Sequence, residues 1–166
     1  MAIIGLGSNV GDRLTHLREA VLELKKHGTV QRLSSAYETA PLYVEDQGSF
    51  LNAVLLYETD LGPLELLKQL KQIESEIGRQ SRQRYGPREI DLDLLAYGQL
   101  QYAFHNGSQV RLQVPHPKIV ERRFVLEPLA EIAPSAELPG MGIVLELVSS
   151  IEVQNQHVSR LPDAIL

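Results

Sequence analysis

In the first 95 residues, segments with two kinds of apolar spacing alternate along the chain. The order of these segments constrains the fold more than any other feature of the sequence. Short apolar runs, typical of buried strands, alternate with stretches whose apolar residues recur every three or four positions, as on one face of a helix. The resulting order is strand, helix, strand, strand, helix, strand. This is the order of a split β-α-β sandwich, so we predict an α+β, ferredoxin-like fold in which helices back an antiparallel sheet.

Two segments have the spacing of amphipathic helices. The first is expected from about Asp12 to His27, and Gly28 stands where a left-handed helix stop belongs. The second is expected to begin at Pro63, a residue favoured in the first turn, and to end at Gly78. The apolar positions that define them are Leu14, Leu17, Val21 and Leu24 in the first, and Leu64, Leu67, Leu70, Ile73 and Ile77 in the second.

Apolar runs bounded by turn residues predict the strands. In the first 95 residues these are Ala2 to Leu6, Val30 to Tyr37, Phe50 to Tyr57 and Ile90 to Leu94. Two later runs, Gln101 to Phe104 and Val110 to Val114, are expected to pair around a turn. Short helices are expected from Pro117 onward, with a last turn or two at Val144 to Val148. No linker interrupts the chain, and residues 1–166 have the length of one domain, so a single domain is expected.

Composition narrows the classes of function. The chain has no cysteine, which excludes disulfides and thiolate metal sites and favours a hard ion such as Mg²⁺ on oxygen or imidazole ligands. No apolar run approaches the roughly 18 residues that cross a bilayer, and the N-terminus lacks a basic leader, so a cytoplasmic protein without a membrane partner is expected. The net charge of −5 disfavours nucleic acid as a partner.

Asp91 and Asp93 are the first candidates for a metal site. Because successive side chains of a strand point to opposite faces, both carboxylates project from one face, and the apolar residues around them turn into the core: Ile90, Leu92 and Leu94. The repulsion between the two carboxylates would be relieved by a bound divalent cation. An acidic pair on a strand can also simply face solvent, and for an isolated pair this is the more common case.

Four arginines stand immediately before the acidic pair: Arg79, Arg82, Arg84 and Arg88. The guanidinium group matches the oxygens of a phosphate. Phosphoryl transfer needs acids that bind metal beside cations that bind phosphate, because positioning and charge neutralisation supply most of the catalysis. From residue types alone, an exposed basic loop that balances the neighbouring acids explains the cluster equally well.

The segment RYGPREIDLDLL, Arg84 to Leu95, resembles the signature of the hydroxymethyldihydropterin pyrophosphokinase family of the folate pathway. Four more segments fit the same family in the same order: GLGSN at Gly5 to Asn9, YETAPL at Tyr37 to Leu42, FLNAV at Phe50 to Val54, and VPHPKIVERRFVLEPL at Val114 to Leu129. The resemblance weakens after about Ser135. The chain departs from the family at Tyr85, where tryptophan is common, and at Pro117, where an aromatic residue is frequent.

The resemblance implies transfer of the β,γ-pyrophosphoryl unit of ATP to the hydroxymethyl oxygen of 6-hydroxymethyl-7,8-dihydropterin, leaving AMP. It implies that Asp91 and Asp93 hold Mg²⁺ and that Arg79 and Arg88 are catalytic. It places ATP against Glu74, Arg82, Tyr85, Arg111, Gln113, His116 and Arg122. It places the pterin against Gly7, Thr39, Ala40, Leu42, Phe50, Asn52 and Phe124. The two substrates would be the partners of a monomeric enzyme.

The chemistry of three pterin-side residues agrees with this assignment. A flat, polar heteroaromatic ring stacks on phenylalanines such as Phe50 and Phe124, and it pairs with an amide such as Asn52, which both donates and accepts. Without the resemblance, both phenylalanines would be assigned to the core. His116 lies between two prolines that fix its backbone and suggest a helix beginning at Pro117, and a histidine held there can donate to a phosphate.

Two other functions remain open on the residues alone. A ferredoxin-like module with an arginine cluster can bind RNA, although the acidic total and the lack of an aromatic RNA-binding motif count against it. The same acids and arginines would also serve a magnesium-dependent kinase or phosphatase of another small substrate. The chain contains neither a P-loop nor a dinucleotide-binding glycine fingerprint, so ATP would have to bind through another architecture.

Overall fold

The computed structural model describes residues 1–41, 47–80, 86–151, 156–162, 164 and 166. The strands and helices in chain order are β1 (Ala2–Ser8), α1 (Arg13–His27), β2 (Thr29–Leu33), β3 (Ala36–Thr39), β4 (Phe50–Glu58), α2 (Pro63–Glu76), β5 (Asp91–Tyr97), β6 (Tyr102–Asn106), β7 (Gln109–Val114), the 3-10 helix η1 (Ile119–Glu121), α3 (Arg123–Ile132), β8 (Glu137–Leu138), β9 (Gly142–Ile143), α4 (Val144–Ser150) and β10 (Val158–Leu161).

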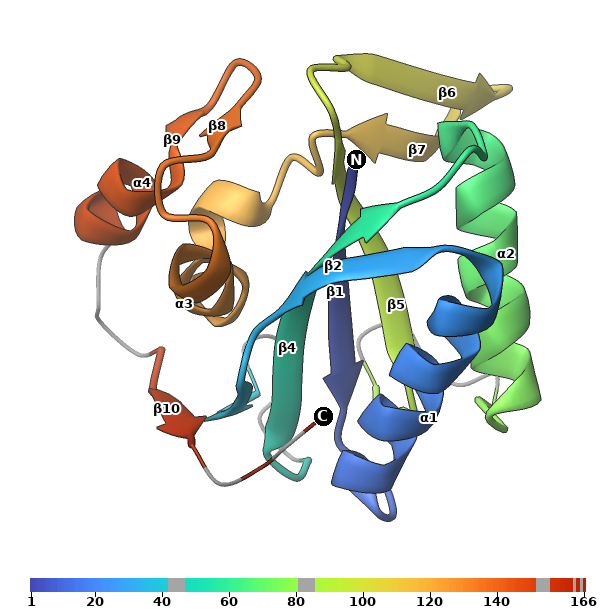
Figure 1. The fold of residues 1–166 in the computed structure, drawn as a ribbon, viewed down its shortest axis with the longest axis vertical. Helices are drawn as coiled ribbons and strands as arrows, with labels where there is room; N and C mark the ends of the chain where they lie inside the picture. Colours follow the sequence, from blue (N-terminus) through green and yellow to red (C-terminus); the bar gives the residue numbers. More distant parts are fainter. Residues whose placement is uncertain (42–46, 81–85, 152–155, 163, 165) are drawn as a thin grey trace.

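The main sheet is antiparallel and has the strand order β10-β3-β4-β1-β5, with β2 also paired to β4. Helices α1 and α2 cover one face of this sheet, and α3 lies on the other (Figure 1). The first and third predicted strands, β1 and β4, are neighbours at the centre, and β5 lies outside β1. This arrangement confirms the predicted α+β, ferredoxin-like fold.

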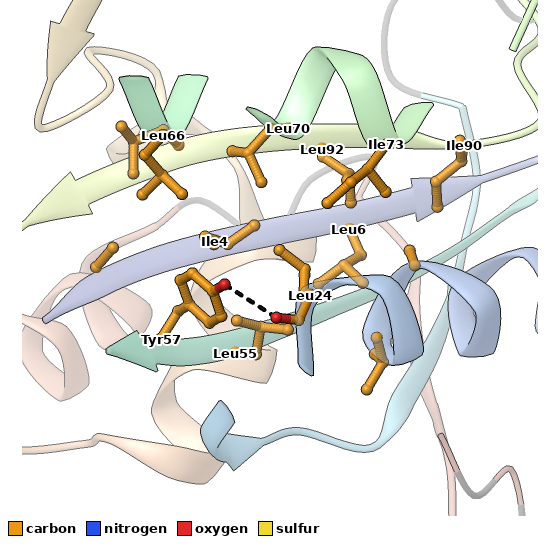
Figure 2. Packing of buried hydrophobic residues seen from close by; sticks show 14 of the residues in the cluster. Ile4, Leu6, Leu24, Leu55, Tyr57, Leu66, Leu70, Ile73, Ile90 and Leu92 are labelled. Carbon is orange, nitrogen blue, oxygen red and sulfur yellow. Dashed lines mark hydrogen bonds between the residues drawn. The ribbon is translucent and has the colours of Figure 1, made fainter. Parts of the chain in front are cut away.

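The larger core lies between the sheet and helices α1 and α2 (Figure 2). Helix α2 contributes Leu66, Leu70 and Ile73, all essentially unexposed, and they pack above β1 and β5. At the other helix, the hydroxyl of Tyr57 on β4 donates to the carbonyl of Leu24 at 2.9 Å and joins the sheet to the last turn of α1. Both predicted apolar stripes therefore face the core, as expected from their spacing.

A second core lies on the opposite face, where α3 packs mainly against β4 and also contacts β3 and β10. The residues that α3 buries there are Val125, Leu126, Leu129 and Ile132. On the sheet side, a β-bulge between Ile3 and Ile4 of β1 places Leu95 and Ala96 of β5 together in this core. A cavity lies on the same face, beside the beginning of α3.

Gly28 does not end α1 in the predicted left-handed conformation. Its φ of 179° is extended backbone, which any residue adopts. A Cβ atom at this position would lie 2.6 Å from the carbonyl oxygen of Glu58 and 2.6 Å from the ring of Tyr57. A glycine is therefore required here by the close approach of β4, a tertiary contact that the local sequence does not reveal.

Two other expected elements differ in the structure. The single strand predicted from Val30 to Tyr37 is divided into β2 and β3, because Ser34 turns its hydroxyl to the backbone N–H of Val54 at 3.0 Å. The helix predicted to begin at Pro117 begins later, as η1 at Ile119, and α3 follows from Arg123. The predicted pairing around residues 105–108 is confirmed as the β6–β7 hairpin.

Strand β10 has no counterpart among the sequence predictions. It pairs with β3 at the edge of the sheet, with Val158 opposite Thr39 and Leu161 opposite Ala36. The two middle residues of β10 are both exposed, so buried and exposed positions do not alternate along it as they do in a half-buried strand. Among the residues that the structure describes, no helix combines the length and the apolar character needed to cross a membrane.

Candidate active site

The cavity has a volume of about 560 Å³ and is lined by residues from β1, β3, β4, β5, β7, α2 and the beginning of α3. It brings together most of the predicted site residues: Gly7, Thr39, Ala40, Phe50, Asn52, Arg79, Arg88, Asp91, Asp93, Arg111, Gln113, His116, Arg122 and Phe124. Glu74 is buried and is not among the lining residues. The predictions for Leu42, Arg82 and Tyr85 lie outside the described residues.

The two acids lie on the cavity side of β5, as their alternation predicted. In the register of the sheet, Asp91 is opposite Gly7 and Asp93 is opposite Gly5, so neither carboxylate has a side chain beside it on β1. The apolar residues of alternate positions belong to the core on the other face: Ile90, Leu92 and Leu94. The missing Cβ atoms make space for neighbouring side chains, Leu95 at Gly5 and Asn52 at Gly7.

Three cations surround the carboxylate of Asp91. Arg88 forms an ion pair with it, Nη1 of Arg79 lies 2.9 Å from its Oδ1, and Nζ of Lys71 lies 3.9 Å from the same oxygen. Burial alone would raise the pKa of Asp91, but the charges of Lys71, Arg88 and Arg79 outweigh it and hold the pKa below its ordinary value of 3.8. The Asp91 carboxyl group is therefore ionised at neutral pH.

Glu74 on α2 supports this cluster from behind. Its Oε1 accepts from Nζ of Lys71 at 2.6 Å and from the backbone N–H of Leu92 at 2.6 Å, while its Oε2 pairs with Arg79. These bonds fasten α2 to β5 and fix the guanidinium of Arg79 next to Asp91. Burial would lower the pKa of Arg79, but Asp91 and Glu74 raise it above its ordinary value.

Sequence reasoning missed Lys71, which lines the cavity. A signal was present, because Lys71 follows Leu67 by four residues and precedes Glu74 by three, and residues at these separations share one face of a helix. A lysine on the apolar stripe of α2, one turn before a glutamate, indicates an ion pair on the face of the helix that contacts the sheet.

The carboxylate of Asp93 faces the opposite wall, at the beginning of α3. Nη1 of Arg122 lies 3.6 Å from Oδ2 of Asp93, and the guanidinium lies 5.6 Å from the centre of the Phe124 ring. Arg122 is only 7% exposed, so its charge acts in a site largely closed to water. On β7, Arg111 and Gln113 also line the cavity.

His116 completes this wall. Its Nδ1 accepts from the backbone N–H of Lys118 at 3.2 Å, so the neutral ring carries its proton on Nε2, where it can donate to a ligand. Burial and the positive charge of Arg122 lower the pKa of His116 below its ordinary value of 6.5. The ring is therefore neutral at physiological pH.

An NMR titration of the ring is expected to give His116 a pKa below 6.5, and Arg122→Ala is expected to raise it, because a positive charge disfavours protonation nearby. As pH falls through about 6.5, His116 takes up a proton in the unfolded chain before it does in the folded chain. Protonation of His116 therefore lowers the free energy of unfolding in acid and has no effect above pH 7. A pKa at or above 6.5, or no change in the variant, would contradict this description.

The other end of the cavity is formed by β3 and β4. Nδ2 of Asn52 donates to Oγ1 of Thr39 at 2.8 Å, and both residues are buried. A Cβ atom at Gly7 would lie 2.9 Å from Oδ1 of Asn52, so the glycine makes space for this amide. Phe50, which also lines the cavity, supplies an aromatic ring beside it. The combination suits a flat polar ring.

Asn9, in the first motif, holds the segment that carries Arg88. Its backbone N–H donates to the carbonyl of Arg88 at 3.1 Å, and its Oδ1 accepts from the backbone N–H of Arg88 at 2.8 Å. Its Nδ2 donates to Gln47 at 3.0 Å on the other side. Asn9 was not among the predicted site residues, because its partners lie far away in the sequence.

The acidic pair suits a hard divalent ion. Mg²⁺ is typically bound in proteins by one or two carboxylates together with substrate phosphates and water. Within the described part of the chain, no group of three histidine or acidic side chains is placed to hold a metal ion. The pair Asp91 and Asp93, with arginines on both sides, suits an ion that completes its coordination with ligands from a substrate.

Comparisons with known proteins agree with this geometry. Residues 3–134 match the model of the family described as 7,8-dihydro-6-hydroxymethylpterin-pyrophosphokinase (HPPK). The chain is 48% identical over 139 residues to 2-amino-4-hydroxy-6-hydroxymethyldihydropteridine pyrophosphokinase of Bacillus subtilis, covering 82% of this chain and 80% of that protein. It is 50% identical over 135 residues to the mitochondrial folate synthesis bifunctional protein of Pisum sativum, covering 81% of this chain but only 25% of that protein.

A solved structure of HPPK-DHPS from Plasmodium falciparum has the same fold, with a TM-score of 0.74 at 15% identity over 89% of this chain and 44% of that chain. The agreement of the family model with the Bacillus subtilis relative settles the family and, with it, the choice among the three functions left open by the residues. The chain belongs to the 7,8-dihydro-6-hydroxymethylpterin-pyrophosphokinase family and is an ATP-dependent pyrophosphokinase of folate biosynthesis.

Proposed function

We propose that this cavity holds Mg²⁺-ATP and 6-hydroxymethyl-7,8-dihydropterin side by side. The observation that carries this proposal is the division of the cavity into two ends. One end has the acids Asp91 and Asp93 among arginines, and the other has an amide, Asn52, beside an aromatic ring. A volume of about 560 Å³ lies within the usual range of small-molecule sites, roughly 300–1,000 Å³.

In the proposed reaction, the hydroxymethyl oxygen of the pterin attacks the β-phosphorus of ATP. A bond forms between this oxygen and the β-phosphorus, the bond from the β-phosphorus to the α,β-bridging oxygen breaks, and AMP leaves. The hydroxyl proton is released. Since Asp91 and Asp93 are assigned to the metal ion, catalysis rests on alignment and charge rather than on a protein base.

Asp91 and Asp93 would hold Mg²⁺, which, when bound, neutralises charge on the phosphate oxygens and fixes their orientation. Arg79 and Arg88 lie on one side of the acids and Arg122 on the other. We propose that these guanidiniums turn from the carboxylates to the phosphates when the nucleotide binds, because each fork matches two phosphate oxygens. His116 would donate a hydrogen bond from Nε2 to a phosphate oxygen, on the same side of the two acids as Arg122.

On the side of β4, we propose that Asn52 pairs with the edge of the pterin and Phe50 contacts one of its faces, while Phe124, beside Arg122, contacts the other. Thr39 orients Asn52 through its hydroxyl, and Ala40 closes the rim beside it. The roles given to Leu42, Arg82 and Tyr85 stay predictions, as do the monomeric state, the single domain of residues 1–166 and the cytoplasmic location.

Product analysis tests the proposal directly. The protein is incubated with ATP, Mg²⁺ and 6-hydroxymethyl-7,8-dihydropterin, and the nucleotides are separated by chromatography. We expect AMP in equal amount to the pterin diphosphate, no product after chelation with EDTA, and recovery when Mg²⁺ is added back. ADP would mean single phosphoryl transfer, and free phosphate would mean hydrolysis; either result, or no turnover, would overturn the proposal.

A further inference from the structure

The side chain of Gln156 reaches the beginning of α3 from the C-terminal part of the chain. Its Oε1 accepts from the backbone N–H of Arg123 at 2.9 Å, and its Nε2 donates to the backbone carbonyl of Glu121 at 2.9 Å. These two peptide groups stand on either side of Arg122. Gln156 lies beyond residues 3–134, which match the family model.

Arg122 stands at the junction between η1 and α3. It ends η1 and is also the N-cap of α3, with φ −113° and ψ 93°, and its side chain makes no capping hydrogen bond. The first N–H groups of a helix have no acceptor within the helix and need one from elsewhere. Gln156 supplies this cap from a distant part of the sequence.

The position of Gln156 is itself fixed by strand β10. This strand pairs with β3, and the carbonyl of His157 accepts from the backbone N–H of Ala40 at 3.4 Å. Arg160 on β10 binds Oε1 of Glu131 on α3 at 2.8 Å and donates to Oγ of Ser35 at 3.0 Å. The segment from residue 156 to residue 161 therefore joins β3 to α3, two elements that line the cavity.

We infer that Gln156 is a positioning residue for pyrophosphoryl transfer, which acts by holding the backbone on both sides of Arg122. The inference rests on the function proposed for the cavity. The Arg122 guanidinium faces Asp93 at 3.6 Å, and small changes in its backbone angles would move it relative to both the acid and the phosphates. Gln156 is not among the residues that line the cavity, so we infer that its effect on the reaction passes mainly through Arg122.

Steady-state kinetics of Gln156→Ala tests the inference. We expect kcat to fall by about tenfold, because a shift of a fraction of an ångström at a charged group is sufficient for such a loss. KM for the pterin is expected to change less than kcat does, since Asn52 and Phe50 are untouched and only Phe124 follows the altered backbone directly. Gln156→Glu keeps the acceptor for the N–H of Arg123 and loses the donor to the carbonyl of Glu121, so its kcat should lie between those of Gln156→Ala and the wild type.

Ser159→Ala is the matched control, because it changes an exposed side chain on β10 and leaves the pairing with β3 in place. Circular dichroism and thermal melting are measured for all variants. If Gln156→Ala does not fold, Gln156→Glu carries the test by itself. A wild-type kcat in the folded variant, or a loss equal to that of Ser159→Ala, would overturn the inference.

A double variant separates positioning from general support. If Gln156 acts through Arg122, then Gln156→Ala lowers kcat about tenfold in the wild type and less than about twofold in the Arg122→Ala background, because residues that act on one contact are not additive. Equal losses in both backgrounds would show a merely structural role. Full activity of Arg122→Ala would instead contradict the role given to Arg122 in the proposed function.

Discussion

Asp93→Asn is expected to lower kcat by about 10³-fold, the scale on which enzymes lose rate when a group that holds transition-state charge is removed. The reason is that an amide is a poor ligand for Mg²⁺ and leaves the phosphate charge unbalanced. The fold should be kept, since the Asp93 side chain is 38% exposed and its nearest cation, Arg122, is 3.6 Å away. Turnover is measured by AMP release at saturating ATP and pterin.

Asp60→Asn is the control for this variant, because Asp60 is exposed in the turn after β4 and does not line the cavity. Near-normal turnover of Asp93→Asn at saturating Mg²⁺ would contradict the metal assignment. Magnesium titration in the wild type and in the variant adds a second measurement, in which the variant is expected to need a higher Mg²⁺ concentration for half-maximal rate.

Asp91→Asn is expected to give a similar loss of turnover together with a loss of stability that Asp93→Asn does not show. Removing this carboxylate leaves Arg79 and Arg88 without their shared counter-charge, which we expect to destabilise the fold by about 2 kcal/mol at pH 7. Because the folded pKa of Asp91 lies below 3.8, its contribution is complete above that pH and is lost as pH falls through the folded pKa. Urea unfolding at pH 7 and pH 3 checks the difference.

Arg88→Ala is expected to lower kcat by about 10²-fold or more, with a smaller change in KM for ATP. A guanidinium that neutralises charge gained in the transition state contributes to kcat more than to ground-state binding. The variant should fold, because the backbone of Arg88 is held by Asn9, and Asp91 keeps Arg79 and Lys71 as partners. Initial rates at varied ATP concentration separate the two constants.

Arg88→Lys keeps the charge but not the fork, so its kcat should lie between those of Arg88→Ala and the wild type. Arg18→Ala, an exposed arginine of α1 away from the cavity, serves as the control. Equal kcat values for Arg88→Ala and the control would contradict the role of Arg88.

Much of the fold was predictable because the information is local. The alternation of Asp91 and Asp93 with apolar neighbours fixed which face of β5 each side chain occupies, and the spacing of leucines located α1 and α2. What could not be predicted depends on contacts between distant residues. Gly28 is explained by the approach of β4, and β10 forms only because β3 offers a free edge.

In the candidate site, too, the residues close together in the sequence were predictable and those that depend on distant contacts were not. The acids and arginines stand close together in the sequence, and their chemistry suggested a phosphate and metal site before the resemblance specified the reaction. The supporting residues gave weaker signals. Asn9 and Gln156 hold backbone groups of other segments, and Lys71 donates to the carbonyl of Leu92 on β5; these partners come together only once the chain is folded.

The absence of side chains at Gly5 and Gly7 has a consequence for the thermodynamics of binding. These positions of β1 lie between β4 and β5, both hydrogen-bonded to it, so this floor of the cavity is rigid peptide backbone. Bare backbone in a central strand has no rotamers to lose when a ligand settles on it. The loss of conformational entropy on binding therefore comes from the long side chains above the floor, mostly from Lys71 and the arginines. Ordering these side chains offsets part of the affinity gained from the phosphates.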